Sequence, residues 1–206
     1  MPVDHRDPAT RATQSRGRCH LYVFPCAYED LLKLGFSRDP LVRLQQLHPR
    51  WFEFFDLDHG FLVETESVPD ARKLELRYRR LLEDHNAPQP LTVRDDAGGA
   101  REWFRGAQAL LEQAAIDLRE AGHVVHAPLR PWLRDALERR ADLLFSWTSA
   151  MLDPDAMGGI AQSGVIPPTP AQRLVRDALD AYAALGIDLA PWLPPSVYDW
   201  HRATAG

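Results

Sequence analysis

The strongest constraint on the fold is the stretch from Leu21 to Leu47, where two short apolar runs with the composition of β-strands lead directly into a helix signal. The first run stops at Pro25, because proline cannot donate a hydrogen bond to a strand ladder. The link to the second run is short, so an antiparallel hairpin is the economical pairing. Side chains alternate between the two faces of a strand, which allows Lys33 of the second run to lie near Tyr22 of the first. The sequence does not fix the register that decides this.

The helix after this hairpin has a clear start. Asp39 supplies a side-chain acceptor at the N-cap, and Pro40 follows at the first helical position, where its missing N–H is no loss. At about 100° per residue, Arg43 falls at the border of the leucine stripe that faces the core. We therefore expect its aliphatic stem to be packed and its guanidinium to reach a concave edge. A third strand is expected within the aromatic segment from Trp51 to Thr65.

A second helix, expected from Ala71 to Leu82, begins after a capping box at Ser67. Glu75 lies inside the apolar sector of this helix. Burial of an ionised carboxylate without a partner is costly, so Glu75 requires a cation, a metal or hydrogen-bond donors. The other faces of the helix are basic. A solvated charged face is the commoner explanation of such a run, and contact with phosphates is the alternative.

The block from about Cys19 to Gly106 resembles the GIY-YIG nuclease superfamily, in particular the branch whose second motif reads K-I-G followed by a serine. Several short motifs carry the resemblance through their order and spacing: Tyr22, Lys33-Leu34-Gly35-Phe36-Ser37, Arg38-Asp39-Pro40 leading to Arg43, Ala71-Arg72-Lys73-Leu74-Glu75, and Glu102-Trp103-Phe104.

The resemblance implies an α/β (α+β) fold, with a small three-stranded antiparallel sheet flanked by helices, that cleaves DNA with one divalent metal ion. Glu75 would hold Mg²⁺ or Mn²⁺, Arg43 would neutralise the scissile phosphate, and Tyr22 would activate or position the attacking water. These residue types suit that chemistry. A hard divalent cation takes few protein oxygens and keeps several waters, and an arginine fork matches the geometry of a phosphate. We expect further DNA contacts from three arginines: Arg38, Arg72 and Arg79.

Two departures from the superfamily pattern stand out. The first motif, His20-Leu21-Tyr22, lacks the glycine of the family, and Lys33 stands where the second tyrosine would be. Lysine is usual at that position in the K-I-G branch, where it would assist Tyr22 or hold a phosphate. The histidine that some members carry one turn after the arginine corresponds here to Leu47, so it cannot act as a base.

Each candidate also has an ordinary structural explanation when it is taken alone. Tyr22 is then a core residue, Lys33 a solvated strand residue and Arg43 a cation at the rim. Glu75 is then the partner of Arg79, four residues further along the same helix. The shared-site interpretation rests on the occurrence of all four residues at the spacing of the family.

The composition of the chain indicates which partners and which cellular compartment to expect. The formal net charge of the 206-residue chain is −5, whereas dedicated DNA-binding proteins are more often basic. The sequence has no apolar run of membrane-spanning length and no secretory signal pattern, so we expect no membrane partner. The two cysteines, Cys19 and Cys26, lack the spacing of metal ligands and suit a reduced, cytoplasmic setting.

The expected organisation has three parts: a flexible N-terminal arm over residues 1–17, a nuclease-like domain over residues 18–127 and a helical C-terminal region over residues 128–206. The segment from Glu83 to Arg101 is expected to be a long loop that covers the site or stays mobile. Acidic residues outnumber Lys and Arg in the C-terminal region. We therefore expect residues 129–206 to serve a protein partner or self-association, and not to bind nucleic acid electrostatically.

The sequence thus predicts a metal-dependent DNA endonuclease with Tyr22, Lys33, Arg43 and Glu75 as its catalytic residues. One alternative is an inactive nucleic-acid-binding module that keeps the fold and the phosphate-holding arginine. Another is a protein-interaction protein that acts through the C-terminal helices.

Overall fold

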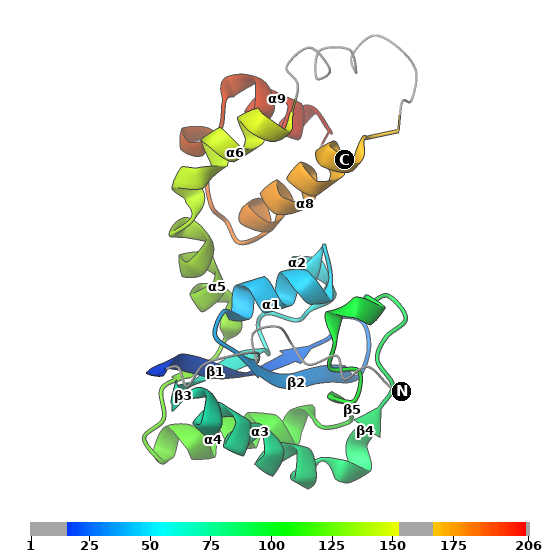
Figure 1. Cartoon of the computed structure of the whole chain (residues 1–206), viewed down its shortest axis with the longest axis vertical. Coiled ribbons are helices and arrows are strands. Elements are labelled where there is room, and N and C mark those ends of the chain that lie inside the picture. The colour runs from blue at the N-terminus through cyan, green and yellow to red at the C-terminus, as the bar shows by residue number, and fades with distance from the viewer. Residues whose placement is uncertain (1–15, 153–166, 205–206) are drawn as a thin grey trace. The chain divides into compact units, whose positions relative to one another are not determined.

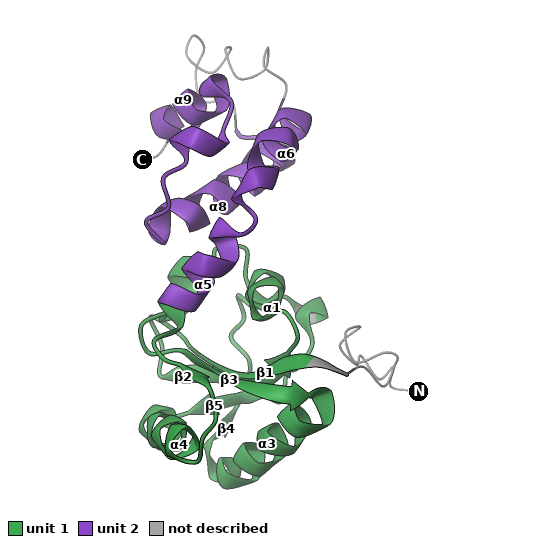
Figure 2. Cartoon of the chain, turned by 90° about the vertical axis from the view of Figure 1, so that its left-hand side faces the viewer, with its two compact units in different colours: residues 1–130 green, residues 131–206 purple. Residues whose placement is uncertain are grey.

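The computed structural model describes residues 16–152 and 167–204. The chain divides into two compact units, residues 1–130 and 131–206 (Figure 2). Almost all of the expected N-terminal arm lies outside the described residues. So does most of the segment from Asp153 to Pro170, whose glycine and proline pairs favour a linker or loop. Within those two ranges, no helix combines the length and the apolar character that crossing a membrane requires.

The first unit is built on one antiparallel sheet with the strand order β4-β5-β2-β1-β3-β6 (Figure 1). Its centre consists of the three predicted strands, which are β1 (Arg16–Pro25), β2 (Leu31–Ser37) and β3 (Phe61–Ser67). Three short strands extend its edges: β4 (Asn86–Ala87), β5 (Trp103–Arg105) and β6 (Val125–His126). The predicted mixed fold is confirmed, although the sheet has six strands instead of three. Strands of two or three residues are too short to show an alternating pattern in the sequence.

Helices cover both faces of the sheet (Figure 1). On one face lie α1 (Pro40–Leu47) and the single turn α2 (Trp51–Phe54), and on the other lie α3 (Val68–Leu81) and α4 (Gln108–Glu120). Both predicted N-cap side chains are present, because Asp39 accepts a hydrogen bond from the N–H of Val42 and Ser67 accepts one from the N–H of Asp70. The second helix starts directly after Ser67, at Val68, three residues before the predicted start at Ala71. The aromatic segment that was predicted to contain the third strand begins as the helical turn α2, and the strand starts only at Phe61.

The main core lies between the sheet and the pair α3 and α4. Buried leucine, valine and phenylalanine side chains from alternate positions of the central strands meet Tyr78 within α3, Leu82 just after it, and the inner face of α4. Because neighbouring residues of a strand point to opposite faces, the residues between these core positions face α1 instead. Tyr22, Phe24 and Lys33 are on that second face, and it carries the candidate site.

The second unit is helical, as predicted. Its helices are α5 (Leu129–Glu138), which begins at the end of the first unit, α6 (Leu144–Met151), α8 (Pro170–Ala184) and α9 (Pro195–Thr204). The apolar spacing from Pro131 to Leu152 favours one continuous helix, but the structure has two helices there, separated by a 3-10 turn at Ala141–Leu143. Thr169 and Gln172 form a reciprocal capping box at the start of α8. Nε2 of His201 lies 2.8 Å from a carboxylate oxygen of Asp180, which ties α9 to α8.

Candidate active site

Tyr22 and Lys33 lie on the same face of the central hairpin. The register pairs Tyr22 with Gly35 and Phe24 with Lys33, so Tyr22 and Lys33 are diagonal neighbours. The ring of Tyr22 stacks on Phe24, with 4.3 Å between the ring centroids, and lies across Gly35. A Cβ atom at position 35 would be 2.6 Å from Cζ of Tyr22, so only glycine leaves room for the ring.

Arg43 reaches this face from α1. Its side chain is buried, and its Nε donates a hydrogen bond of 3.2 Å to the hydroxyl oxygen of Tyr22. Nη1 donates to the carbonyl oxygen of Ala97 at 2.5 Å, and Nη2 donates to that of Gly98 at 3.2 Å. All three guanidinium nitrogens are therefore engaged, two of them by carbonyl groups of the loop that was expected to cover the site.

Lys33 is fully buried beneath the same loop. Its Nζ lies 2.5 Å from Oε2 of Glu102 and 5.9 Å from the ring centroid of Trp103. Burial lowers the pKa of Lys33 to about 8, because desolvation disfavours the charged amine, and the neighbouring carboxylate of Glu102 opposes this shift. The pairing of Lys33 with Trp103 across β2 and β5 fixes the position of Glu102, the residue before that strand.

Glu75 approaches from α3 and is 4 % exposed. Burial raises the pKa of Glu75, and the negative charge of Glu102 adds to the effect. Nη1 of Arg79 lies 3.5 Å from Oε1 of Glu75 and 3.9 Å from Oε1 of Glu102. One guanidinium thus lies between two carboxylates, which is a position that a cation would be expected to occupy.

The structure brings the four predicted catalytic residues into one constellation. Arg43 is hydrogen-bonded to Tyr22, and the charges of Arg43 and Glu75 both act on the pKa of Lys33. Of the three arginines predicted to contact DNA, Arg79 joins the constellation, whereas Arg38 and Arg72 have exposed side chains outside it. The result is a pair of buried cations beside a pair of carboxylates, which is an arrangement able to bind an anionic ester and a metal ion.

Sequence reasoning missed two parts of this constellation. Glu102 was part of the terminal Glu-Trp-Phe motif but was not assigned to the site, although it contacts both Lys33 and Arg79. Its signal was a lone acid directly before an aromatic pair that returns to the core. Gly99, with a φ of +73°, lies so close that a Cβ atom there would be 2.6 Å from Nζ of Lys33. Its signal was the Gly98-Gly99 pair, which marks a backbone that must turn tightly.

The site offers few ligand atoms for a metal ion. Within residues 16–152 and 167–204, no group of three or more His, Cys, Asp or Glu side chains is placed to hold a metal ion. Glu75, with Glu102 nearby, offers hard carboxylate oxygens only. That set fits an ion such as Mg²⁺, which keeps most of its waters and uses one or two protein carboxylates. It does not fit a structural zinc site, which takes four ligands.

The comparison with known protein families gives a match over the same part of the chain. The family model of the T5orf172 domain matches residues 20–124, which are 105 of the 206 residues. The chain belongs to the T5orf172 family. The T5orf172 domain occurs in some nucleases, which is compatible with a nuclease or DNA-binding role. No curated protein and no solved structure matches the chain.

The T5orf172 domain contains the whole constellation, from Tyr22 on β1 to Glu102 before β5. It also includes α3 and α4, and it ends before β6. The second unit lies outside the family match. All residues of the constellation therefore belong to the first unit.

Proposed function

We propose that this chain is a metal-dependent endonuclease that hydrolyses DNA phosphodiester bonds through a GIY-YIG-like site. The observation that carries the proposal is the convergence of four buried residues within a T5orf172 domain: Tyr22, Lys33 and Arg43 meet on the α1 face of the sheet, and Glu75 reaches them from α3. Burial of three ionisable groups in so small a region is costly for the fold, and such clusters are characteristic of functional sites.

In this proposal Arg43 binds the scissile phosphate. Its planar fork matches two phosphate oxygens, and its contact with Tyr22 uses only Nε, so Nη1 and Nη2 remain for an anion. The carbonyl oxygens of Ala97 and Gly98 now accept the hydrogen bonds that phosphate oxygens would accept. Binding of DNA therefore requires the loop to withdraw from Arg43.

Tyr22 positions or activates the attacking water. Its hydroxyl oxygen accepts the hydrogen bond from Arg43, so its own proton is directed elsewhere and the ring is held in one orientation. Stacking on Phe24 and the absence of a side chain at Gly35 hold the ring further. Lys33, oriented by Glu102, supplies a second positive charge for the phosphate or its developing charge.

Glu75 is the residue that would hold the divalent ion, Mg²⁺ or Mn²⁺. When bound, such an ion polarises a phosphoryl oxygen and stabilises the leaving oxyanion. The carboxylate of Glu102 adds negative charge beside Glu75, which favours a cation there. Three arginines are proposed to contact the DNA backbone. Arg38 and Arg72 are exposed, and Arg79 borders both the carboxylates and solvent because its side chain is 35 % exposed.

Cleavage assays test this proposal. The protein would be incubated with supercoiled plasmid and with single-stranded, duplex and branched DNA, in Mg²⁺, Mn²⁺ or EDTA. We expect metal-dependent cleavage by the wild type and a loss of roughly 10²–10³-fold in Glu75→Gln and Arg43→Gln, the size seen when one key electrostatic group is removed. Glu83→Gln, which changes an exposed carboxylate just beyond α3, is the matched control and should cleave normally. Equal cleavage by the wild type and Glu75→Gln would refute the proposed site.

One observation favours a second candidate, a nucleic-acid-binding module that does not cleave. Arg79 lies 3.5 Å from Glu75, and carbonyl groups of the loop accept from Nη1 and Nη2 of Arg43, so both groups have partners within the chain. Such a module would bind DNA with a strong dependence on salt, because phosphate contacts release counterions. Its binding would be independent of Mg²⁺ and unchanged by Glu75→Gln. Measurement of DNA affinity against salt, with and without Mg²⁺, separates the two candidates.

A further inference from the structure

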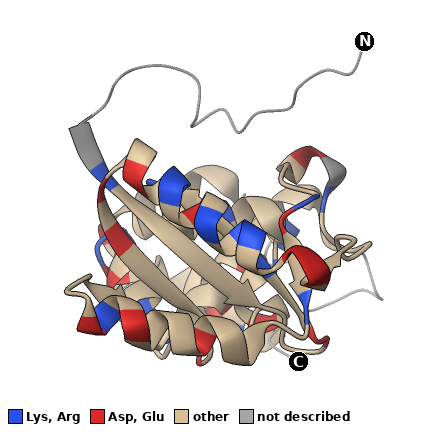
Figure 3. Ribbon diagram, turned by 90° about the horizontal axis from the view of Figure 1, so that it is seen from below, with Lys and Arg blue, Asp and Glu red and all other residues tan. Residues whose placement is uncertain are grey.

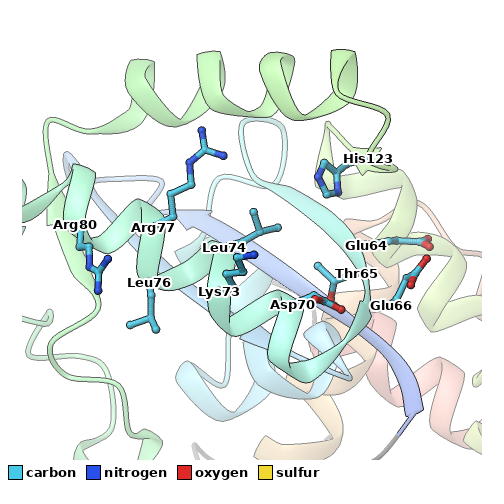
Figure 4. A pocket seen from close by; sticks show the side chains of 10 residues that line it. All are labelled: Glu64, Thr65, Glu66, Asp70, Lys73, Leu74, Leu76, Arg77, Arg80 and His123. Atoms are coloured by element: carbon cyan, nitrogen blue, oxygen red, sulfur yellow. The ribbon is translucent and has the colours of Figure 1, made fainter.

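The side of the sheet opposite the candidate site carries a second surface. There α3 and α4 lie side by side, and an open groove of about 820 Å³ lies along α3, the end of β3 and His123 (Figure 4). Leu74 and Arg77 point from α3 toward α4, and Lys73 and Arg80 line the groove as well. We call the outward surfaces of these two helices the α3–α4 face.

The two helices of this face have opposite charges. On α3 the outward cations are Lys73, Arg77 and Arg80, and on α4 the outward acids are Glu112, Asp117 and Glu120, all with exposed side chains. Seen from this side, α3 is marked mainly by basic residues and α4 mainly by acidic ones (Figure 3). Within the described parts of the chain, none of these six side chains forms an ion pair. Gln108 and Gln113 donate hydrogen bonds to Glu112 and Asp117 within α4. These donors are neutral, so each set of charges can still attract a partner of opposite charge.

The face is also partly apolar. Leu76 on α3 is 41 % exposed, and Leu110 and Ile116 on α4 are 45 % and 46 % exposed. Single exposed aliphatic residues are ordinary, and Leu76 points away from α4 (Figure 4). Leu110 and Ile116 lie among the acids of α4 and supply part of the apolar area that an interface needs in addition to its charged rim.

Charge decides which occupant this face suits. A nucleic acid backbone would be attracted by α3 but repelled by the three acids of α4 beside it. A second copy of the chain offers both signs at once. If a two-fold axis runs between the two helices and parallel to them, α3 of each protomer faces α4 of its partner, and the favourable pairing occurs twice. We propose that the α3–α4 face is a homodimer interface.

This dimer does not use the candidate site. On the α3 wheel, Glu75 and Arg79 are on the flank toward the constellation, whereas Lys73, Arg77 and Arg80 are turned away from it. The groove is lined by the second set and not by the first. Each protomer of the dimer therefore keeps its own proposed nuclease site accessible. Dimerisation can be tested independently of cleavage.

Charge reversal in two complementary variants tests the proposal. The α3 variant carries Lys73→Glu, Arg77→Glu and Arg80→Glu, and the α4 variant carries Glu112→Lys, Asp117→Lys and Glu120→Lys. All six positions are exposed, so both variants should fold. The mass of the full chain in solution would be measured by sedimentation velocity over a range of concentrations. We expect the wild type to dimerise, each variant alone to be monomeric, and an equimolar mixture of the two to form a heterodimer.

The equimolar mixture is the decisive measurement, because a folding defect in one variant would not be corrected by adding the other variant. Arg101→Glu with Arg105→Glu, which reverses two exposed charges outside the face, is the matched control and should dimerise like the wild type. A monomeric wild type overturns the proposal, as does a mixture that stays monomeric while both variants show a folded circular dichroism spectrum. Dimerisation of each variant alone would place the interface elsewhere. Loss of DNA binding in the α3 variant of a monomeric protein would identify the face as a nucleic-acid surface instead.

Discussion

Gly35 shows how closely the candidate site is packed at the scale of single residues. A Cβ atom at this position would be 2.6 Å from Cζ of Tyr22, so Gly35→Ala should push the ring aside and break its hydrogen bond with Arg43. We expect a loss of stability of about 1–3 kcal/mol, as for other overpacked cores, together with a large loss of cleavage. Urea denaturation and plasmid nicking measure the two effects.

Tyr22→Phe is the comparison, because it removes only the hydroxyl that Arg43 contacts. It should lower the free energy of unfolding by about 0.5–1.5 kcal/mol, the usual net contribution of one hydrogen bond. It should also remove the part of the cleavage rate that depends on the hydroxyl. If Gly35→Ala proved as stable and as active as the wild type, the ring could not be held as described.

Lys33 makes the site sensitive to pH. Its pKa of about 8 lies below its ordinary value of 10.5, so the folded protein loses this proton at a lower pH than the unfolded chain. Between these values the unfolded chain binds more protons, and this group therefore makes the free energy of unfolding rise with pH. Cleavage that uses the charged amine should instead decline above about pH 8.

Glu102→Gln sharpens this prediction. The variant removes the carboxylate that raises the pKa of Lys33, so the alkaline decline of cleavage should move to lower pH. The pH profile of kcat at saturating DNA measures the shift. An alkaline limb at the same pH in the variant and the wild type would show that the limb does not report on Lys33.

Among the elements, the loop before β5 determines access to Arg43. Gly99 has a φ of +73° and no room for a Cβ atom, so Gly99→Ala should displace the loop through both backbone strain and contact with Lys33. We expect faster amide exchange in residues 94–100. Because the carbonyl groups of the loop compete with phosphate for Arg43, we also expect severalfold tighter DNA binding.

Gly122→Ala is the matched control for this loop. Gly122 also has a positive φ, +92°, but a Cβ atom there would meet nothing within 4 Å. It imposes similar backbone strain far from the site and should leave DNA affinity unchanged. Weaker DNA binding in Gly99→Ala alone would mean that the loop helps to bind DNA instead of competing with it.

The elements that local signals specify were predicted well. Such signals act on residues close to them in sequence. Proline ends β1, and side-chain acceptors cap the starts of α1 and α3, at the positions that the sequence indicates. Helix faces were predicted less well. Leu81, Leu110 and Leu174 fall within the apolar stripes of their helices, which favours an inward orientation, but they are 58 %, 45 % and 54 % exposed. A helical wheel gives the width of an apolar stripe, whereas tertiary packing decides how much of it is covered.

For the molecule as a whole, the candidate site was predictable in part. The residues on β1, β2, α1 and α3 occur at the spacing of a family, and they do converge. Glu102 and the carbonyl groups of Ala97 and Gly98 reach the site from a loop whose path depends on contacts distant in sequence. Such contacts leave no periodic signal. The predicted role of residues 129–206 in binding a partner stays a prediction, because the family match ends before them.

The division of the chain leads to a prediction about the separate units. All residues of the constellation lie in residues 1–130, whose last residue is anchored by two hydrogen bonds from the Arg130 side chain to Asp58 and by its N–H to the carbonyl oxygen of Leu57. A chain that ends at Arg130 should therefore fold and nick supercoiled plasmid at a rate similar to that of the full chain. Circular dichroism and plasmid nicking measure this. Asp58→Ala in the shortened chain should lower its melting temperature, because the Arg130 side chain then loses both of its hydrogen bonds to Asp58. A shortened chain that folds but no longer cleaves would show that the second unit contributes directly to catalysis.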